Sequence, residues 1–430
     1  MPKNLIIIAP NTMSTYTITG GVDLSGEIAV SGSKNAALPM IASTLFFEHA
    51  ELTNVPDISD VHLLCEILKS LGSKVSFSDH ILTIDNTNLS LEGLNRELFK
   101  TARATYYLIP PLLARFGNVS LRYPGGCSIG KRPIDGIVQG LRKFGYENSQ
   151  IDDMLSFSGH DNGEAIAVNA YFSVGSTIVL LLSALARTQT TTIQLAAYEP
   201  HVMNIIDVLR LAGAHIALRY DHTIIITPAP LASQMSGEVV GDYIVSGTLA
   251  VIGALTARDY IDIHRARIAD LTAFLFVIAK MGVRYEVIGE TLRVYRTKTL
   301  KSTELQTNIY PGFPTDLQSP ASILMTQADG MSRIHEVLFE GRLNWLVELE
   351  KMRGHIALLN PHEALVFGKT PLRGTQVSSW DLRSGAAMLI AGMIAEGETI
   401  LENVSHIERG YESFAAGLRS IGAKIEKNNL

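Results

Sequence analysis

The sequence predicts an α/β protein of two similar domains, each made of three copies of a strand–helix–strand–helix–strand–strand unit. The first observation is a pattern that recurs six times: an amphipathic run of helical period, a glycine, and then alternating apolar and polar residues. The second is the spacing, because the units follow one another at intervals of about 70 residues and nearly fill the 430-residue chain. The third is a further helical run in each unit that is rich in small and apolar residues.

The first helix of each unit is expected to be buried, because apolar and small residues occur on nearly every side of its helical period. A β-like stretch such as AELTNV or ETILENV follows it, and a polar turn leads to the second helix. The six runs that predict the buried helix are NAALPMIASTLFF, ATYYLIPPLLARF, SVGSTIVLLLSALA, SGTLAVIGALTA, SPASILMTQADG and GAAMLIAGMIAEG.

The second helix is one-sided and is expected to face solvent along its polar stripe. The glycine after it suits the left-handed conformation in which helices often end, where a Cβ is unfavourable. Beyond the glycine, alternation, a polar turn and renewed alternation predict a hairpin that closes the unit. The six glycines are Gly72, Gly145, Gly213, Gly282, Gly354 and Gly422.

Six units divide evenly into two domains of three. Residues 34–240 are expected to form one three-repeat α/β domain. Residues 1–33 and 241–430 are expected to form the second, so that the N-terminal strand joins the C-terminal half. A cleft between two such domains is a common place for a ligand, and we expect the active site there.

The composition excludes several classes of partner. The formal net charge is −6 and no basic cluster is present, so no nucleic-acid partner is expected. Two cysteines are too few for a disulfide framework and fit a reducing compartment. The start MPKNLIIIAP does not have the pattern of a signal peptide, and the most apolar run, TIVLLLSALA, is too short to span a membrane. We therefore expect a cytoplasmic protein with no membrane partner.

Charged residues gather at two places of the unit, the start of the buried helix and the turn before the second helix. A structural helix start needs only a cap, and Ser173, Asp316 and Asp381 can be explained in that way. Lysine and arginine are unfavourable near the positive end of a helix unless an anion binds beside them. The cations at these two places predict a small, multiply charged anion between the domains, and they are Lys34, Arg132, Arg342, Arg383 and Arg409.

One cysteine lies in the loop PGGCSIGKRP, where three glycines leave Cys127 uncovered and Lys131 and Arg132 follow closely. Cationic neighbours lower the pKa of a thiol, so the loop predicts a reactive thiol beside an anion site. The alternative is a glycine turn around an inert thiol. Cys65 lies in the apolar run LLCEILKSLG and is expected in the core. No His/Cys cluster has the spacing of metal ligands, and no metal is expected.

The repeat and a series of segments resemble the enolpyruvyl transferases, and most closely the branch that acts on UDP-N-acetylglucosamine. These segments span Gly26 to Glu426 in family order, and the loop cysteine followed by Arg132 and Pro133 separates this branch from the shikimate-pathway branch. The resemblance implies that each domain is an inside-out α/β barrel and that the active site lies in the interdomain cleft. The matching segments are SGSKNAALP, KTARATYYLIPPLLARFG, PGGCSIGKRPID, SVGST, FPTDLQ, FEGR, WDLRSGAAMLIAG and IERGYE.

The resemblance also implies a reaction. The enolpyruvyl group of phosphoenolpyruvate passes to the 3′-hydroxyl of UDP-N-acetylglucosamine and phosphate is released, in peptidoglycan precursor synthesis and without a cofactor. This chemistry needs an acid for the methylene carbon, a base for the hydroxyl, and cations for phosphate and carboxylate. By resemblance, Cys127 is the acid and can form a covalent adduct with phosphoenolpyruvate, Asp316 is the base, and Asp381 lies close to the reacting carbons.

The same resemblance implies two sets of binding residues. Those implied for phosphoenolpyruvate are Lys34, Asn35, Arg132, Arg342, Arg383 and Arg409. Those implied for UDP-N-acetylglucosamine are Asn35, Arg103, Arg132, Pro133, Ile134, Asp135, Gly136, Ser173, Val174, Asp316 and Leu338.

Four positions depart from the family pattern. Gly341 stands where an asparagine is usual, Ile137 where a histidine is common, Tyr171 where a lysine is often found, and Tyr243 where an arginine is usual. None is an implied acid, base or phosphoenolpyruvate cation, so the reaction class is better supported than the acceptor. One alternative is an enolpyruvyl transferase for another nucleotide or nucleoside alcohol in secondary metabolism. Another is an inactive paralogue that binds nucleotide sugar, which the retained acid–base pair disfavours.

Overall fold

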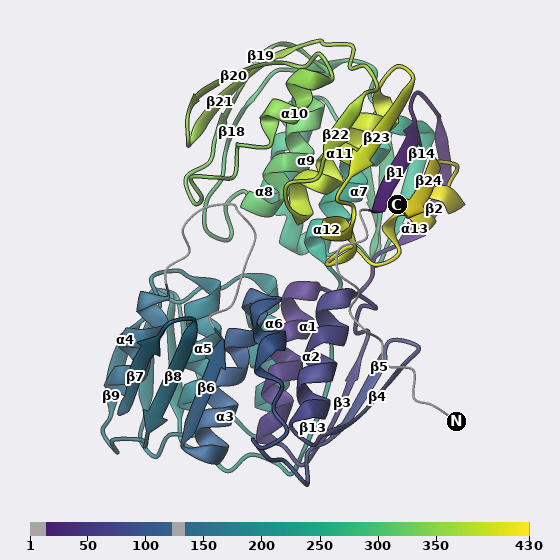
Figure 1. The fold of residues 1–430 in the computed structure, drawn as a ribbon. Helices are drawn as coiled ribbons and strands as arrows, with labels where there is room; N and C mark the ends of the chain where they lie inside the picture. The colour runs from purple at the N-terminus through teal and green to yellow at the C-terminus, as the bar shows by residue number, and fades with distance from the viewer. Residues whose placement is uncertain (1–13, 123–133, 430) are drawn as a thin grey trace, which may run out of the picture.

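The computed structural model describes residues 14–122 and 134–429, which form two lobes (Figure 1). Their buried apolar side chains fall into two separate clusters, one from residues 36–239 and the other from residues 16–30 and 243–425. This two-domain α/β architecture confirms the predicted fold class. The exact domain boundaries, 33/34 and 240/241, stay a prediction that the two cores support.

The lobe formed by the first half of the chain is the lower one in Figure 1. Its helices are α1 (Lys34–Ser43), α2 (Ser59–Ser70), α3 (Ile109–Phe116), α4 (Asp135–Lys143), α5 (Val174–Ala184) and α6 (Pro200–Leu211), with 3₁₀ turns at Thr44–Phe46, Arg96–Lys100 and Arg103–Leu108. Its first sheet has the order β13 (Gln234–Glu238), β3 (His49–Thr53), β5 (Ile81–Asp85), β4 (Lys74–Ser78). The other two sheets are β6 (Asn118–Arg122), β8 (Met154–Gly159), β7 (Tyr146–Ile151), and β11 (His215–Arg219), β12 (Thr223–Thr227), β10 (Thr191–Gln194), β9 (Ile166–Asn169).

The upper lobe repeats this plan. Its helices are α7 (Tyr243–Thr256), α8 (Thr272–Lys280), α9 (Thr315–Thr326), α10 (Leu346–Lys351), α11 (Leu382–Ile394), α12 (Ser405–Glu408) and α13 (Phe414–Ser420), with a 3₁₀ turn at Ile268–Leu271. Its first sheet has the order β15 (Tyr285–Ile288), β16 (Thr291–Tyr295), β14 (Ala257–His264), β2 (Leu24–Ala29). The second sheet has the order β17 (Leu300–Lys301), β19 (Ala328–His335), β21 (Glu363–Gly368), β20 (His355–Asn360), and β18 (Glu304–Gln306) also pairs with β19. The third sheet has the order β22 (Gln376–Ser378), β23 (Glu398–Glu402), β1 (Ser14–Thr19), β24 (Lys424–Asn429).

The strands of the third, fifth and sixth units pair by one rule. The strand before the buried helix runs parallel to the strand after it, as β9 does with β10, and the closing hairpin pairs antiparallel to that second strand. The second unit departs from the prediction, because a 3₁₀ turn at Arg96–Lys100 replaces its first strand and its sheet has three strands. The sixth unit lacks a last strand of its own, and β1 from the N-terminus takes that place between β23 and β24.

The two lobes exchange strands. The strand β2 precedes α1 in sequence but pairs in parallel with β14 of the upper lobe, whereas β13 precedes α7 and pairs with β3 of the lower lobe. The chain therefore crosses between the lobes twice, and the crossing segments are bonded to each other: Ser33 N donates to Val240 O at 2.7 Å, and Asp242 N donates to Ser31 O at 3.0 Å. A Cβ on Gly32 would lie 1.8 Å from the carbonyl oxygen of Asn54, so only glycine fits this crossing.

The predicted left-handed glycine after the second helix is confirmed in five units and wrong in the fifth. There Arg353 has φ +68°, and Gly354, one residue later, does not have positive φ. Helix α10 ends at Lys351, so the left-handed position falls one residue earlier than the glycine. Gly354 has another reason to be glycine, because a Cβ there would lie 2.8 Å from the carbonyl oxygen of Leu349.

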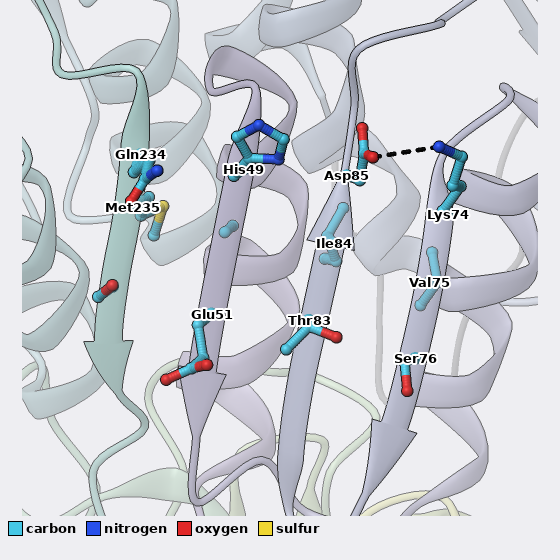
Figure 2. A pocket seen from close by; sticks show the side chains of 12 residues that line it. His49, Glu51, Lys74, Val75, Ser76, Thr83, Ile84, Asp85, Gln234 and Met235 are labelled. Carbon is cyan, nitrogen blue, oxygen red and sulfur yellow. Dashed lines mark hydrogen bonds and ion pairs between the residues drawn. The ribbon is translucent and has the colours of Figure 1, made fainter.

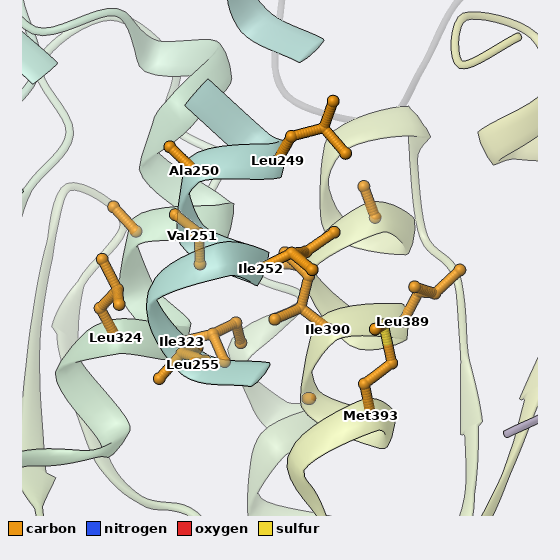
Figure 3. Close-up of a cluster of buried hydrophobic side chains, with 14 of the residues drawn as sticks. Leu249, Ala250, Val251, Ile252, Leu255, Ile323, Leu324, Leu389, Ile390 and Met393 are labelled. Carbon is orange, nitrogen blue, oxygen red and sulfur yellow. The ribbon is translucent and has the colours of Figure 1, made fainter. Parts of the chain in front are cut away.

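The predicted buried helices form the centre of each lobe. In the upper lobe α7, α9 and α11 pack together, and Figure 3 shows apolar side chains of all three interdigitating, including Leu249, Ile252, Ile323 and Ile390. Small residues allow this close approach, since a Cβ on Gly247 of α7 would lie 2.5 Å from a methyl group of Leu317 on α9. Because these helices are buried on all sides, their N-terminal residues are held in fixed positions.

Candidate active site

A first cluster of charge joins the two lobes. Lys34 opens α1, and its Nζ lies 2.8 Å from Oδ2 of Asp60, which belongs to the first turn of α2. Arg409 follows α12 in the upper lobe, and its Nε lies 2.9 Å from the other carboxylate oxygen of Asp60. The Lys34 and Asp60 side chains are only 12% and 6% exposed, and that of Arg409 is 27% exposed. One buried carboxylate therefore holds one cation from each lobe.

Burial and charge act in opposite directions on this cluster. Burial lowers the pKa of Lys34 below its ordinary value; the carboxylate of Asp60 opposes that effect, while the positive charges of Arg409 and Arg383 add to it. Burial alone would raise the pKa of Asp60, but Lys34 and Arg409 outweigh it and lower that pKa. Asp60 is therefore ionised at neutral pH, and the two cations are stabilised by it.

A second cluster lies within the upper lobe. Asp316 is the second residue of α9 and forms ion pairs with Arg342 and Arg383. Arg383 donates to Oδ2 of Asp316 from Nε at 3.1 Å and from Nη2 at 3.0 Å, while Arg342 donates to Oδ1. Burial lowers the pKa of Arg383, but Asp316, Tyr411 and Asp242 together outweigh it, so the net shift is upward. Both arginine side chains are 3% exposed.

Each of these arginines has a further donor. Arg342 Nε and Arg383 Nη1 are both buried and have no hydrogen-bond acceptor within residues 14–122 and 134–429. A buried N–H without an acceptor costs free energy, about 1–3 kcal/mol for a typical group. Two such groups beside one carboxylate are suited to a second planar anion, because guanidinium groups pair with carboxylates through two hydrogen bonds.

The two clusters lie within electrostatic range of each other. The charge of Arg383 acts on Lys34, and a Cβ on Gly410 would contact both Lys34 Cδ at 3.0 Å and Leu382 Cδ2 at 2.6 Å. The N-termini of α1 and α11 therefore meet across the domain boundary. The four cations of the two clusters exceed the two carboxylates, Asp60 and Asp316, so these six side chains carry a net charge of +2. A multiply charged anion is the complementary ligand.

Asp381 is also at this helix start, as the N-cap of α11. Its Oδ1 accepts from the backbone N–H of Arg383 at 2.7 Å and of Ser384 at 3.2 Å, and the Ser384 hydroxyl completes a capping box. The capping explanation of Asp381 is thus confirmed, and it also fixes the backbone from which Arg383 extends. A catalytic role for Asp381 stays a prediction.

The residues predicted for the acceptor lie on several elements. Asn35 is the second residue of α1, Ile134 and Asp135 precede and open α4, and Ser173 caps α5 by accepting from the backbone N–H of Ser176. Arg103 opens a 3₁₀ turn with its guanidinium 5.6 Å from the Tyr106 ring centroid.

The starts of α4 and α5 are brought together. A Cβ on Gly136 would lie 3.1 Å from Ser176 Oγ and 3.7 Å from the Tyr171 ring, so Gly136 lies against the segment that carries Ser173 and Val174. Leu338 follows β19 in the other lobe and is 36% exposed. The structure therefore divides the predicted acceptor residues between the lobes, and their roles stay a prediction.

Three predicted site residues lie outside the described residues. They are Cys127, Arg132 and Pro133. Of the residues that depart from the family pattern, Ile137 and Tyr243 are buried and Tyr171 is exposed. Cys65 is buried as predicted, and burial raises the pKa of its thiol to about 12, so it is inert at neutral pH.

Sequence reasoning missed Asp60 and Glu336. Asp60 resembles an ordinary first-turn acid of an amphipathic helix, and its only signal is its place in the unit, the start of the second helix. Glu336 is fully buried at the end of β19. Nothing in the local pattern shows that either side chain has partners in distant segments.

One hollow in the described residues is separate from these clusters. It is a concavity of about 520 Å³ on the outer face of the sheet that contains β3, β4, β5 and β13, where His49, Glu51, Lys74 and Asp85 project (Figure 2). It contains no predicted site residue. A hollow of about 380 Å³ lies closer to Arg409, between the α2 start and Glu408 to Ala416. Within the described residues no group of three His, Cys, Asp or Glu could hold a metal ion, and none of their helices is long and apolar enough to cross a membrane.

Comparison with known proteins gives three concordant findings. Residues 18–418 match the family model of EPSP synthase (3-phosphoshikimate 1-carboxyvinyltransferase). The chain is 36% identical over 414 residues to UDP-N-acetylglucosamine 1-carboxyvinyltransferase 3 of Caldanaerobacter subterraneus subsp. tengcongensis, covering 96% of this chain and 99% of that one. It is 35% identical over 416 residues to UDP-N-acetylglucosamine 1-carboxyvinyltransferase of Halothermothrix orenii, covering 96% and 100%.

Solved structures agree. The enolpyruvyl transferase NikO of Streptomyces tendae superposes with a TM-score of 0.89 at 25% identity, covering 97% of this chain and 99% of that one. An EPSP synthase of Acinetobacter baumannii superposes with a TM-score of 0.69 at 16% identity, covering 96% and 100%, which shows a shared fold.

Proposed function

The chain belongs to the EPSP synthase family and is an enolpyruvyl transferase, and from this premise we propose that its acceptor is the 3′-hydroxyl of UDP-N-acetylglucosamine. The observation that supports this acceptor is the 35–36% identity to two UDP-N-acetylglucosamine 1-carboxyvinyltransferases over nearly the whole chain. The pair of charge clusters at the domain boundary supports the other half of the reaction, because together they have the excess positive charge that phosphoenolpyruvate requires. The proposal assigns the reaction to the cytoplasm and to peptidoglycan precursor synthesis, and makes the chain a target of fosfomycin.

The carboxylate of phosphoenolpyruvate is proposed to bind Arg342 and Arg383. Their buried Nε and Nη1 groups have no acceptor among the residues described, and both guanidinium groups already face one carboxylate, that of Asp316. A carboxylate of the substrate would satisfy donors that the protein leaves unpaired.

The phosphate is proposed to bind Lys34 and Arg409, with Arg132 added by resemblance. Asp60 neutralises part of the charge of this pair and keeps the two cations together while they are buried. Because Lys34 comes from the lower lobe and Arg409 from the upper, binding of phosphate to both would favour the closed arrangement of the lobes.

Asp316 is proposed as the base, and its two arginine partners explain how its basicity depends on substrate. Both arginines donate to Asp316, and hydrogen bonds of this kind stabilise the charged form of a carboxylate. When the substrate carboxylate takes part of their hydrogen bonding, the negative charge of Asp316 is less stabilised and its affinity for a proton rises. The base would therefore become active only when phosphoenolpyruvate is bound.

The proposed reaction has two steps, an addition that forms a ketal and an elimination that releases phosphate. The acceptor oxygen bonds to C2 of phosphoenolpyruvate, its proton passes to Asp316, and the thiol of Cys127 gives a proton to the methylene carbon, producing a tetrahedral ketal. The C2–O bond to phosphate then breaks and its electron pair goes to the phosphate oxygen. The Cys127 thiolate takes a proton back from the methyl carbon to form the enol ether, and Asp316 passes its proton to solvent. The negative charge on the departing phosphate would be stabilised by Lys34 and Arg409.

Product analysis tests the acceptor. Incubation with phosphoenolpyruvate and UDP-N-acetylglucosamine is expected to release phosphate and add an enolpyruvyl group to the sugar, and UMP in its place is expected to give none. Mass spectrometry of the chain after incubation with phosphoenolpyruvate, and separately with fosfomycin, is expected to place a mass addition on Cys127. If phosphoenolpyruvate is turned over with UMP but not with UDP-N-acetylglucosamine, the proposed acceptor is wrong and a nucleotide alcohol takes its place.

That second acceptor class is supported by two observations. The structure of NikO superposes closely on this chain, and Ile137, Tyr171 and Tyr243 depart from the family pattern near the expected nucleotide or sugar. A nucleotide or nucleoside alcohol would use the same clusters for phosphoenolpyruvate, so the product assay separates the two classes without any change in the expected chemistry.

A further inference from the structure

Glu336 is a fully buried carboxylate that the proposed chemistry does not use. It follows the last residue of β19 and has no exposed surface. Its Oε2 accepts a hydrogen bond of 2.8 Å from the hydroxyl of Thr315. Thr315 is the first residue of α9 and directly precedes Asp316, the proposed base. One oxygen of Glu336 is therefore attached to the helix start that carries the base.

The other oxygen is attached to the segment proposed to face the acceptor. Glu336 Oε1 accepts from the backbone N–H of Leu338 at 2.9 Å and of Phe339 at 3.2 Å. These two bonds fix the turn from which the Leu338 side chain is presented to solvent. The same turn leads to Arg342, whose guanidinium pairs with Asp316.

The backbone around Glu336 is anchored independently of its carboxylate. Glu336 N donates to His362 O at 2.8 Å, and Val337 N donates to Thr307 Oγ1 at 3.0 Å. The strand end would therefore keep its place without the carboxylate. Within the described residues no cation pairs with the Glu336 carboxylate, and a buried carboxylate held by neutral donors is costly. A buried carboxyl group with hydrogen bonds on both oxygens to two different segments indicates a requirement for its geometry.

We infer that Glu336 is a positioning residue, which holds the turn at Val337–Phe339 and the start of α9 in one register so that the acceptor hydroxyl meets Asp316. This inference rests on the proposed roles of Asp316 and Leu338. Small displacements are expected to matter, because a shift of about 1 Å at a reacting group can cost about 100-fold in rate.

The primary test is Thr315→Val, which keeps the β-branched shape and removes the hydroxyl that joins α9 to Glu336. The matched control is Thr326→Val in the same helix, since Thr326 is buried at the far end of α9. Its hydroxyl bonds only to nearby residues: it donates to Ile323 O at 2.8 Å and accepts from the Gln327 side chain. Thr315→Val is expected to lower kcat and raise KM for UDP-N-acetylglucosamine, with kcat/KM for that substrate falling about tenfold or more. KM for phosphoenolpyruvate is expected to stay within about twofold, and Thr326→Val is expected to move neither constant.

Variants of Glu336 supply the rescue test. Glu336→Gln keeps an oxygen for the two backbone N–H groups and an amide that can donate to Thr315, so it is expected to retain most of the acceptor kcat/KM. Glu336→Leu removes both attachments and is expected to lose at least as much as Thr315→Val. If Glu336→Leu does not fold, the comparison of Thr315→Val with Thr326→Val and of Glu336→Gln with wild type still decides the question.

The outcomes separate this inference from the proposed function. Equal acceptor constants in Thr315→Val and Thr326→Val would overturn the positioning role, as would an equal rise in KM for both substrates, which a general loss of structure would produce. Asp316→Asn is measured in parallel. If that variant keeps wild-type turnover, the proposed base is wrong; if it loses turnover while Thr315→Val is unaffected, only the positioning role fails.

Discussion

Replacing Asp60 by asparagine tests the charge cluster between the lobes. The change keeps the shape of the side chain but removes the carboxylate that lies 2.8 Å from Lys34 Nζ and 2.9 Å from Arg409 Nε. Removing one partner of a buried ion pair costs about 3–5 kcal/mol. Arg409 is about one quarter exposed, so water replaces much of its lost interaction, and Lys34 can lose its proton once Asp60 no longer supports its pKa. The expected loss is therefore at the lower end, about 3 kcal/mol.

Thermal unfolding measures this loss. A cost of about 3 kcal/mol in a domain of this size corresponds to a fall in Tm of about 6–12 °C. The matched control is Asp153→Asn, because Asp153 also bridges a lysine and an arginine, Lys100 and Arg122, but is 43% exposed. Exposed pairs contribute little, so the control is expected to melt close to wild type.

Phosphate adds a second readout that depends on the proposed anion site. In wild type, Asp60 already neutralises part of the charge on Lys34 and Arg409, whereas in Asp60→Asn an added phosphate would be their main counterion. Inorganic phosphate is therefore expected to raise the Tm of the variant by more than it raises that of wild type, by mass action on the folded state. The reasoning is refuted if Asp60→Asn melts with the Asp153→Asn control, or if phosphate stabilises variant and wild type equally.

Three further predictions follow from the structure. Asp316→Asn is expected to lower kcat about 100-fold to 10,000-fold, the usual contribution of a general base. KM for phosphoenolpyruvate is expected to stay nearly unchanged, because both arginines remain. Steady-state kinetics in which KM changes and kcat does not would contradict this prediction. Glu199 accepts a hydrogen bond from the backbone N–H of Tyr310 across the domain boundary, and burial raises its pKa from 4.5 to about 7. Between these pH values the folded protein therefore keeps a proton that the unfolded chain releases. The free energy of unfolding should thus fall as pH rises from about 5 to 7, by at most about 3 kcal/mol. In Glu199→Gln, Tm should change less over this pH range than in wild type. Parallel Tm curves for the two proteins would show that Glu199 does not cause the pH dependence. Gly32→Ala would place a Cβ 1.8 Å from Asn54 O at the chain crossing, so little folded protein is expected. The control in a soluble-yield and circular-dichroism comparison is Gly175→Ala in α5, where the nearest atom to a Cβ would be Ser173 Oγ at 4.0 Å and φ is not positive.

Much of the fold could be predicted because its determinants are local. Helical and strand periods, and the glycine after the second helix, are expressed within a few residues of sequence, and their repetition predicted two domains of three units. The one wrong glycine shows the limit of such reasoning. At Gly354 the left-handed residue is Arg353, because α10 ends one residue earlier relative to its glycine than the other second helices do.

The candidate site was predicted only in part. Lys34, Arg342, Arg383 and Arg409 were identified because cations are unexpected beside helix starts, and the structure brings all four to the domain boundary. Asp60, the partner of Lys34 and Arg409, was not identified, because an acid in the first turn of a helix is common and does not by itself indicate a site.

The sequence by itself therefore determined the repeated unit, the number of domains, the buried helices and the cations at their starts. Only the tertiary structure decided which strands exchange between the lobes, that β1 completes the sixth unit, and that Asp60 pairs with an arginine 349 positions away. The physical reason is the separation along the chain of the residues that interact. Period and helix termination depend on neighbouring residues, whereas strand pairing and ion pairing depend on which edges and charges remain unsatisfied once both lobes have packed.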